Sequence, residues 1–217
     1  FSRWYCRPKY VISAKAHILG TADWPSYLSL LAQAIAIGGI LVFGFITSWV
    51  FGREYSDRTI KDLLALPISR TTIVLSKFAV VILWCLTLSL YALVLSLFIG
   101  VVVDIPFWSF HIMLQGSLIF IICSVLTILL STPVAFFASA GGGYLSPLGF
   151  TVFTLVLAQI VAAVGYGQYF PWSVPALIGG IAGDTGVIEG TSIIIVFFTS
   201  ALGLLATVFW WRYADQN

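Results

Sequence analysis

The chain has 217 residues, of which 60% are hydrophobic, 16% aromatic and 8% charged. A soluble domain carries about 25% charged residues because its surface faces water, so most of this surface must face hydrocarbon. The 10 Lys and Arg exceed the 8 Asp and Glu only enough for a net charge of +2, too little for a nucleic-acid-binding surface. The composition therefore excludes a water-soluble enzyme, a disordered chain and a nucleic-acid-binding module.

Five apolar runs are long enough to cross a bilayer as helices, because a hydrocarbon core of about 30 Å needs about 20 helical residues. We predict spans at about 27–51, 73–103, 109–139, 147–165 and 190–211. The predicted fold class is therefore all-α, a polytopic membrane protein embedded in the lipid bilayer. Several tryptophans lie near the predicted span ends, where amphipathic rings prefer the headgroup layer. They are Trp24, Trp49, Trp108, Trp172, Trp210 and Trp211.

The printed residues begin with Phe1, and the one methionine is Met113. We therefore expect that an initiator end, including a first transmembrane helix, precedes them. In that case residues 1–26 form an external loop; otherwise they are the N-terminal segment of the protein. Residues 27–217 are the predicted transmembrane domain.

The positions of the positive charges predict the orientation in the membrane. The segment 52–72 between the first two spans is rich in Lys and Arg, and Arg212 follows the last span. The segment around Asp104 and the segment 166–189 contain neither. We expect a multi-pass protein of the cell (plasma) membrane. The positive-inside rule then places 52–72 and the C-terminus on its cytoplasmic side. Basic residues in 1–26 fit this orientation only if a helix precedes them.

The segment 52–72 has the pattern of a short amphipathic helix. Residues of opposite charge lie four apart, which makes them neighbours on a helix surface: Glu54 and Arg58, Asp57 and Lys61, Arg58 and Asp62. Ile60, Leu63 and Leu64 lie on the other face. Mixed charges with a narrow apolar stripe favour docking on a protein partner, and a helix resting on the lipid surface is the alternative. Pro67 ends this helix, and Ser69 is placed to cap the next one.

Two stretches of the sequence resemble a known family. Residues 53–70, Arg-Glu-Tyr-Ser-Asp-Arg-Thr-Ile-Lys-Asp-Leu-Leu-Ala-Leu-Pro-Ile-Ser-Arg, followed by Ser76-Lys77-Phe78, resemble the cytoplasmic segment of ABC-2 type transporter permeases. Residues 166–175, Tyr-Gly-Gln-Tyr-Phe-Pro-Trp-Ser-Val-Pro, resemble the external stretch before the last helix in the bacitracin-export group of that family. The family has six helices, so the five predicted here are consistent with a first helix upstream.

The resemblance implies that the amphipathic helix is a coupling helix. The residues that would contact a separate ATP-binding subunit are Glu54, Asp57, Arg58, Thr59, Leu63, Leu64 and Arg70. The sequence has no GxxxxGK[ST] phosphate loop, so this chain needs no cofactor of its own, and ATP and Mg would bind in the partner. The resemblance also implies a pair formed with a second copy or a homologous permease, and export of peptide antibiotics or other amphipathic drugs.

Polar residues inside the predicted spans are few. Gln33, Gln115 and Gln159 either mark a substrate path or make hydrogen bonds between helices, and we expect Lys77 to reach the cytoplasmic edge. An ATP-independent secondary transporter or channel, which usually has charges deep in its spans, and a non-transporting membrane scaffold are the alternative functions. Neither His17 nor His111 has neighbouring ligands, so no metal site is expected. Residues 166–189 form either a re-entrant or interfacial element or a plain loop.

Overall fold

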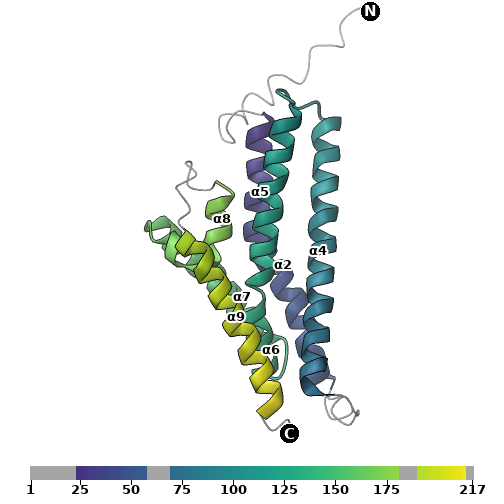
Figure 1. The fold of residues 1–217 in the computed structure, drawn as a ribbon, viewed down its shortest axis with the longest axis vertical. Coiled ribbons are helices and arrows are strands. Elements are labelled where there is room, and N and C mark those ends of the chain that lie inside the picture. The colour runs from purple at the N-terminus through teal and green to yellow at the C-terminus, as the bar shows by residue number, and fades with distance from the viewer. Residues whose placement is uncertain (1–22, 58–68, 181–189, 214–217) are drawn as a thin grey trace, which may run out of the picture.

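The computed structural model describes residues 23–57, 69–180 and 190–213, and all of its elements are helices. In chain order they are α2 (Trp24–Ser56), α4 (Arg70–Val102), α5 (Phe110–Leu129), α6 (Thr132–Ala140), α7 (Leu145–Ala163), two 3-10 turns η1 (Gly167–Tyr169) and η2 (Pro171–Ser173), α8 (Val174–Ile178) and α9 (Gly190–Tyr213). Figure 1 shows α2, α4 and α5 side by side, with α7 and α9 inclined against them.

Five helical stretches are long and apolar enough to cross a membrane, when α5 and α6 are taken together as Phe110–Ala140. The predicted all-α membrane fold with five spans is thus confirmed for the described residues. Local signals set two of the helix starts. The side chain of Asp23 accepts a hydrogen bond from the Ser26 backbone N–H at the start of α2, and Ser69 accepts one from Thr72 at the start of α4. The predicted cap at Ser69 is confirmed.

The end of the first span differs from the prediction. We expected it to end at about residue 51, but α2 continues without interruption to Ser56. Glu54 therefore belongs to the last turns of a transmembrane helix, and a separate helix does not begin at residue 52. Gly52 does not end the helix, because it lies buried inside α2 and does not have the positive φ of a glycine cap. Residues 58–68, which include most of the predicted amphipathic helix, lie outside the described residues.

The third predicted span is present as Phe110–Ala140, but it is made of two helices and not one continuous helix. α5 ends at Leu129 and α6 begins at Thr132. Pro133 has no N–H to donate and disfavours the helical conformation of the preceding turn. Hydroxyl groups bond the freed carbonyls, as lipid requires: Ser131 donates to Ile128 O at 2.7 Å, and Thr132 to Leu129 O at 2.9 Å and to Ser200 O of α9 at 2.8 Å.

Residues 167–178 form a short folded element and not a plain loop. η1 and η2 pack on α7, and α8 packs on α2 and α5. The chain turns back at Gly165, whose φ of +90° favours glycine. Cys123 Sγ on α5 donates to Pro175 O at 3.2 Å, which holds α8 against the bundle. The described part of the segment 166–189 is therefore folded and not a plain loop, whereas residues 181–189 lie outside the described residues.

The core is centred on α2, which contacts α4, α5, α6, α7 and α8. Small residues allow this close approach: a Cβ added to Gly44 would lie 2.6 Å from Thr151 Cγ2 of α7. Two of the tryptophans at the span ends belong to this core. Trp24 is 2% exposed and packs against Gly100, and Trp211 is 0% exposed. Trp49 and Trp108 are exposed.

Candidate functional site

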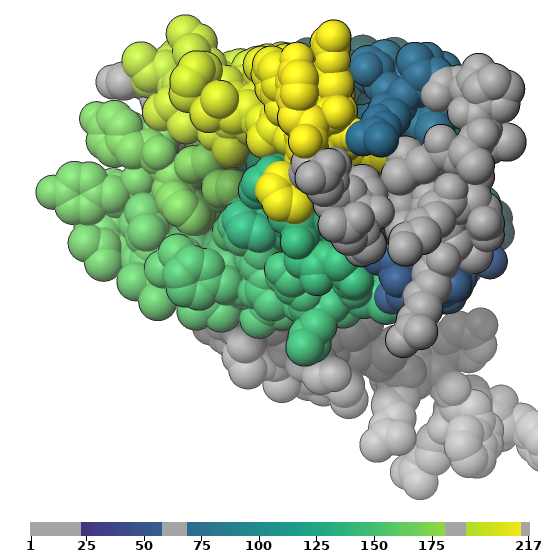
Figure 2. Space-filling view, turned by 90° about the horizontal axis from the view of Figure 1, so that it is seen from below, coloured from purple at the N-terminus to yellow at the C-terminus, as the bar shows by residue number. Residues whose placement is uncertain are grey.

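The two chain segments that flank residues 58–68 meet at one end of the bundle. The last turns of α2 carry Glu54 and Asp57 follows as its C-cap, while Arg70 is the first residue of α4. Figure 2 views this end and shows the last turns of α9 beside the first turns of α4. Of the predicted coupling residues, Arg58, Thr59, Leu63 and Leu64 lie outside the described residues. The structure thus shows the two helix ends that flank the undescribed part of the predicted coupling segment, which we call its anchors: the end of α2 and the start of α4.

Lys77 joins these two anchors. Its Nζ donates to Val50 O at 2.6 Å and forms an ion pair with the carboxylate of Glu54, so α4 is bonded to α2 through both backbone and side chain. The rings of Phe51 and Trp211 lie 5.5 and 5.7 Å from the ammonium group, within cation–π distance. Lys77 is only 8% exposed. Lys77 thus extends to Glu54 in the last turns of α2 and is covered there, and its position relative to the membrane edge remains a prediction.

Trp211 connects the same cluster to two further helices. Its Nε1 donates to Ser139 Oγ of α6 at 2.9 Å, and its backbone carbonyl accepts from Arg70 Nη1 at 3.3 Å. The ring of Tyr55 meets it edge-on, with centroids 6.2 Å apart. We name Glu54, Lys77, Trp211, Arg70 and Ser139 the inner cluster. It joins α2, α4, α6 and α9 beside the ends of the segment 58–68.

The charges at the end of α2 divide into a covered pair and an exposed pair. The Glu54 side chain is 24% exposed and faces Lys77 of its own chain. Arg53 and Asp57 form a pair at 3.3 Å between side chains that are 62% and 51% exposed. Asp57 is therefore placed for contact with another molecule, whereas Glu54 is largely engaged inside the bundle. A role of either residue in partner binding remains a prediction.

The three glutamines of the predicted substrate path lie at the opposite end of the bundle. Gln33 Nε2 donates to Ser29 Oγ at 3.1 Å and to Gly179 O at 3.3 Å, which joins α2 to the end of α8. Gln115 lines a pocket of about 270 Å³ between α2, α5 and α8, and Gln159 lines a separate small recess beside Trp172. Gln33 thus makes hydrogen bonds between helices, which was the alternative to a role in the substrate path. The structure does not bring all three together in one cavity.

The comparisons with known proteins identify the family. Residues 13–158 match the family model described as ABC-2 family transporter protein. The chain belongs to the ABC-2 family of transporter permeases. It is also 30% identical over 177 residues to the bacitracin transport permease protein BCRB of Bacillus licheniformis, and the match covers 82% of this chain and 85% of that protein. No solved structure gives a significant match.

The residues that match the family model include most, but not all, of the inner cluster of this permease. The match includes Glu54, Arg70, Lys77 and Ser139 but ends at residue 158 within α7, so Trp211 of α9 lies beyond it. Sequence reasoning missed the roles of Lys77 and Trp211 within the cluster. A signal for Lys77 was present, since a lysine near the start of an apolar span needs a partner or a route to water. No comparable signal distinguished Trp211 from its exposed neighbours.

Proposed function

We propose that this permease is the transmembrane subunit of an ATP-driven exporter, coupled through the segment 52–72 to a separate ATP-binding subunit in which ATP and Mg bind. Family membership supports the transport role, and a motor in another chain is consistent with the given residues, which contain no phosphate loop. The proposed assembly contains a second permease, either an identical copy or a homologue. Segment 52–72 and the C-terminus face the cytoplasm in this proposal, in agreement with the distribution of positive charge.

The bond from Lys77 to Glu54 and Val50 carries the proposal. It bonds α4 to α2, the two helices that the segment 58–68 connects. A force applied to that segment then moves α2 and α4 as one unit and does not separate them. Trp211 extends the same unit to α6 and α9 through Ser139 and Arg70. Closure of ATP-binding subunits would thus be transmitted to the spans as a rigid-body displacement.

We propose peptide antibiotics or other amphipathic drugs as the substrate class. The relative with 82% coverage of this chain is named for transport of bacitracin. The described parts of the spans offer uncharged polar groups such as Gln115 and Gln159 among apolar residues, and these suit a substrate that is itself partly apolar. Under this proposal the path passes these glutamines, and Gln33 holds α8 beside it.

The test uses the tagged full chain expressed in its native membranes, with the double variant Leu63→Asp and Leu64→Asp. We expect an ATP-binding subunit to co-purify with the wild type and to be lost from the variant, because two carboxylates would replace the predicted apolar contacts. Leu145→Asp is the matched control, since Leu145 is 87% exposed at the first residue of α7. It should retain the subunit. Absence of an ATP-binding subunit from the wild type would refute the coupling.

The substrate class is tested separately by the bacitracin tolerance of the same cells. Deletion of the permease should lower it, and the double variant should lower it to the same extent. If the ATP-binding subunit co-purifies but tolerance does not change on deletion, the substrate assignment is wrong and the coupling stands.

A further inference from the structure

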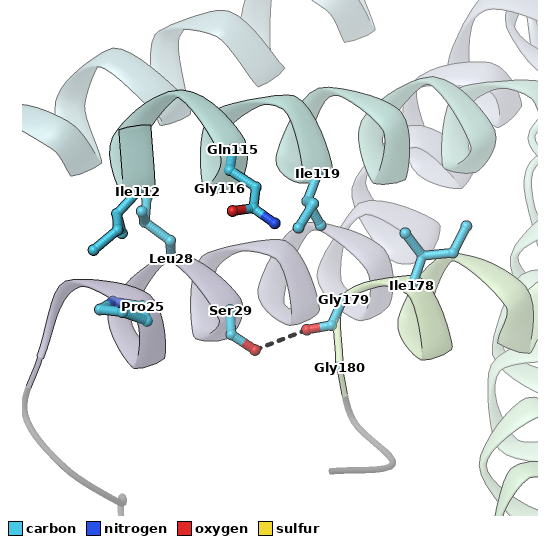
Figure 3. A pocket seen from close by; sticks show the side chains of 10 residues that line it. All are labelled: Pro25, Leu28, Ser29, Ile112, Gln115, Gly116, Ile119, Ile178, Gly179 and Gly180. Atoms are coloured by element: carbon cyan, nitrogen blue, oxygen red, sulfur yellow. Dashed lines mark hydrogen bonds between the residues drawn. The ribbon is translucent and has the colours of Figure 1, made fainter. Parts of the chain in front are cut away.

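A pocket lies between α2, α5 and α8 (Figure 3). Its lining includes the first turns of α2, whereas the inner cluster lies at the other end of that helix. The apolar walls of the pocket are formed by Leu28 of α2, Ile112 and Ile119 of α5, and Ile178 of α8. None of the described residues that line it carries a charge. A volume of about 270 Å³ accommodates about nine groups of the size of a water molecule. The pocket is therefore suited to a short stretch of aliphatic chain.

The polar atoms at the pocket fall into two sets. The first set consists of Ser29, Gln33 and Gly179, which bond one another: Gly179 O accepts from Ser29 Oγ at 2.9 Å and from Gln33 Nε2 at 3.3 Å. Gln115 is different, because its carboxamide makes no hydrogen bond with the residues that the structure describes. Its side chain points from α5 into the space above Ser29 and Gly179 (Figure 3). The pocket thus has one neutral group that is available to a ligand.

The pocket lies at the depth of the upper acyl chains of one leaflet. Gln115 and Ile119 lie about 8 and 14 Å along α5 from its first residue, Phe110, at about 1.5 Å per residue. Trp108 and Phe110 are exposed at the start of α5, and we place the membrane interface of this end beside them because aromatic rings prefer the headgroup layer. Half of a hydrocarbon core measures about 15 Å. A ligand in the pocket therefore comes from the leaflet on this side, opposite the segment 58–68.

We propose that the pocket binds an acyl chain of a glycerophospholipid from this leaflet, with the ester carbonyl accepting a hydrogen bond from Gln115 Nε2. Burial of the chain alone gives no preference over the bilayer, because lipid tails are as apolar as the pocket walls. The hydrogen bond to Gln115 distinguishes the site from bulk lipid. The neutral lining explains why the bonding partner is an ester carbonyl and not a charged headgroup. The proposal concerns lipid binding and does not depend on coupling to an ATP-binding subunit.

The test compares two photoactivatable lipids that differ only in the linkage at the glycerol. The full chain is reconstituted into vesicles of phosphatidylethanolamine and phosphatidylglycerol. Each preparation contains a trace of phosphatidylcholine with a diazirine in its acyl chain, in diester or diether form. Labelled peptides are quantified by mass spectrometry after irradiation. A hydrogen bond in the membrane predicts that the diester labels the pocket residues about three- to ten-fold more strongly than the diether, which lacks the carbonyl.

Two variants extend the comparison. Gln115→Leu should remove the difference between the lipids, and Ile119→Trp should reduce labelling by both because the indole fills the pocket. Ile122→Trp, at a 48% exposed position of the same helix that does not line the pocket, should change neither. Equal labelling of the wild type by the two lipids would overturn the proposal. So would labelling no stronger than at lipid-facing Phe153, as expected if another part of this chain or a second copy fills the pocket.

Discussion

The ion pair between Lys77 and Glu54 should stabilise the fold far more than an ordinary surface pair, and Lys77→Met tests this. Methionine keeps the length of the aliphatic chain beside Phe51 and Trp211 but removes the charge and the donors. Truncating one partner of a fully buried pair costs about 3–5 kcal/mol. Glu54 retains 24% exposure of its side chain, so water solvates part of the orphaned carboxylate, and we expect a loss of about 2–3 kcal/mol.

The measurement is the apparent Tm of the full chain in one detergent. Samples are heated to a series of temperatures, and the fraction that stays folded is measured by fluorescence-detected size-exclusion chromatography. For a chain of this size a loss of about 2–3 kcal/mol corresponds to a fall in Tm of roughly 4–12 °C. The matched control is Asp57→Asn, which breaks the exposed pair with Arg53 on the same turn of α2. Exposed pairs contribute about 0–1 kcal/mol, so the control should lose no more than about 4 °C.

The double variant Lys77→Met with Glu54→Leu completes a thermodynamic cycle. Removing both charges leaves no buried carboxylate without a partner, so the double variant should be more stable than Lys77→Met alone. Two results would refute the reasoning. One is a Lys77→Met Tm as high as that of Asp57→Asn. The other is an additive cycle, in which Glu54→Leu lowers the Tm equally whether or not Lys77 is present.

Two further predictions concern contacts inside the bundle. A Cβ at Gly203 would lie 2.5 Å from the backbone N of Pro133, so Gly203→Ala should lower the apparent Tm through a cost of about 1–3 kcal/mol. Gly149→Ala has open space around it and should leave the Tm unchanged or raise it; equal effects of the two changes would contradict the packing described. Tyr27 donates a hydrogen bond to a backbone carbonyl of α4 at 2.8 Å, so Tyr27→Phe should cost about 0.5–1.5 kcal/mol, measurable in the same heating series. Tyr91 is 66% exposed, and Tyr91→Phe should stay within about 0.5 kcal/mol of the wild type; a loss as large as that of Tyr27→Phe would argue against the bond.

The membrane spans could be predicted because hydropathy is a local property of the sequence. A run of about 20 apolar residues has few alternatives to a transmembrane helix, and the cap at Ser69 depends only on residues within one turn. The break between α5 and α6 was harder, although Pro133 was visible. Transmembrane helices tolerate proline when neighbouring groups bond the freed carbonyls. Here the hydroxyls of Ser131 and Thr132 bond the carbonyls at the break, and Thr132 also bonds Ser200 O of α9, which is distant in sequence.

The inner cluster could not be predicted because its bonds join residues far apart in the chain. Spacing on a helix suggested Arg58 as the partner of Glu54. In the structure Glu54 forms an ion pair with Lys77 of α4, and Arg58 lies outside the described residues. The i, i+4 rule identifies which residues can pair on an isolated helix, whereas tertiary contact decides which of them do. The same limit applies to Trp211: composition places it at a span end, and only packing against Ser139 and Tyr55 makes it part of the core.

The arrangement of polar contacts along α2 is what makes it suitable for transmitting a displacement. Its 33 residues form a continuous helix of about 50 Å, which is held at both ends by hydrogen bonds. Lys77 bonds Val50 and Glu54 at the inner end, while Gln33 bonds Gly179 of the α8 region near the outer end. A helix with unbroken backbone hydrogen bonds resists bending, so movement of its inner end shifts the outer contact as well. α5 and α6 lack this continuity because their hydrogen-bond ladder is interrupted at Leu130 and Ser131. A displacement of the segment 58–68 should therefore reach α8 through α2.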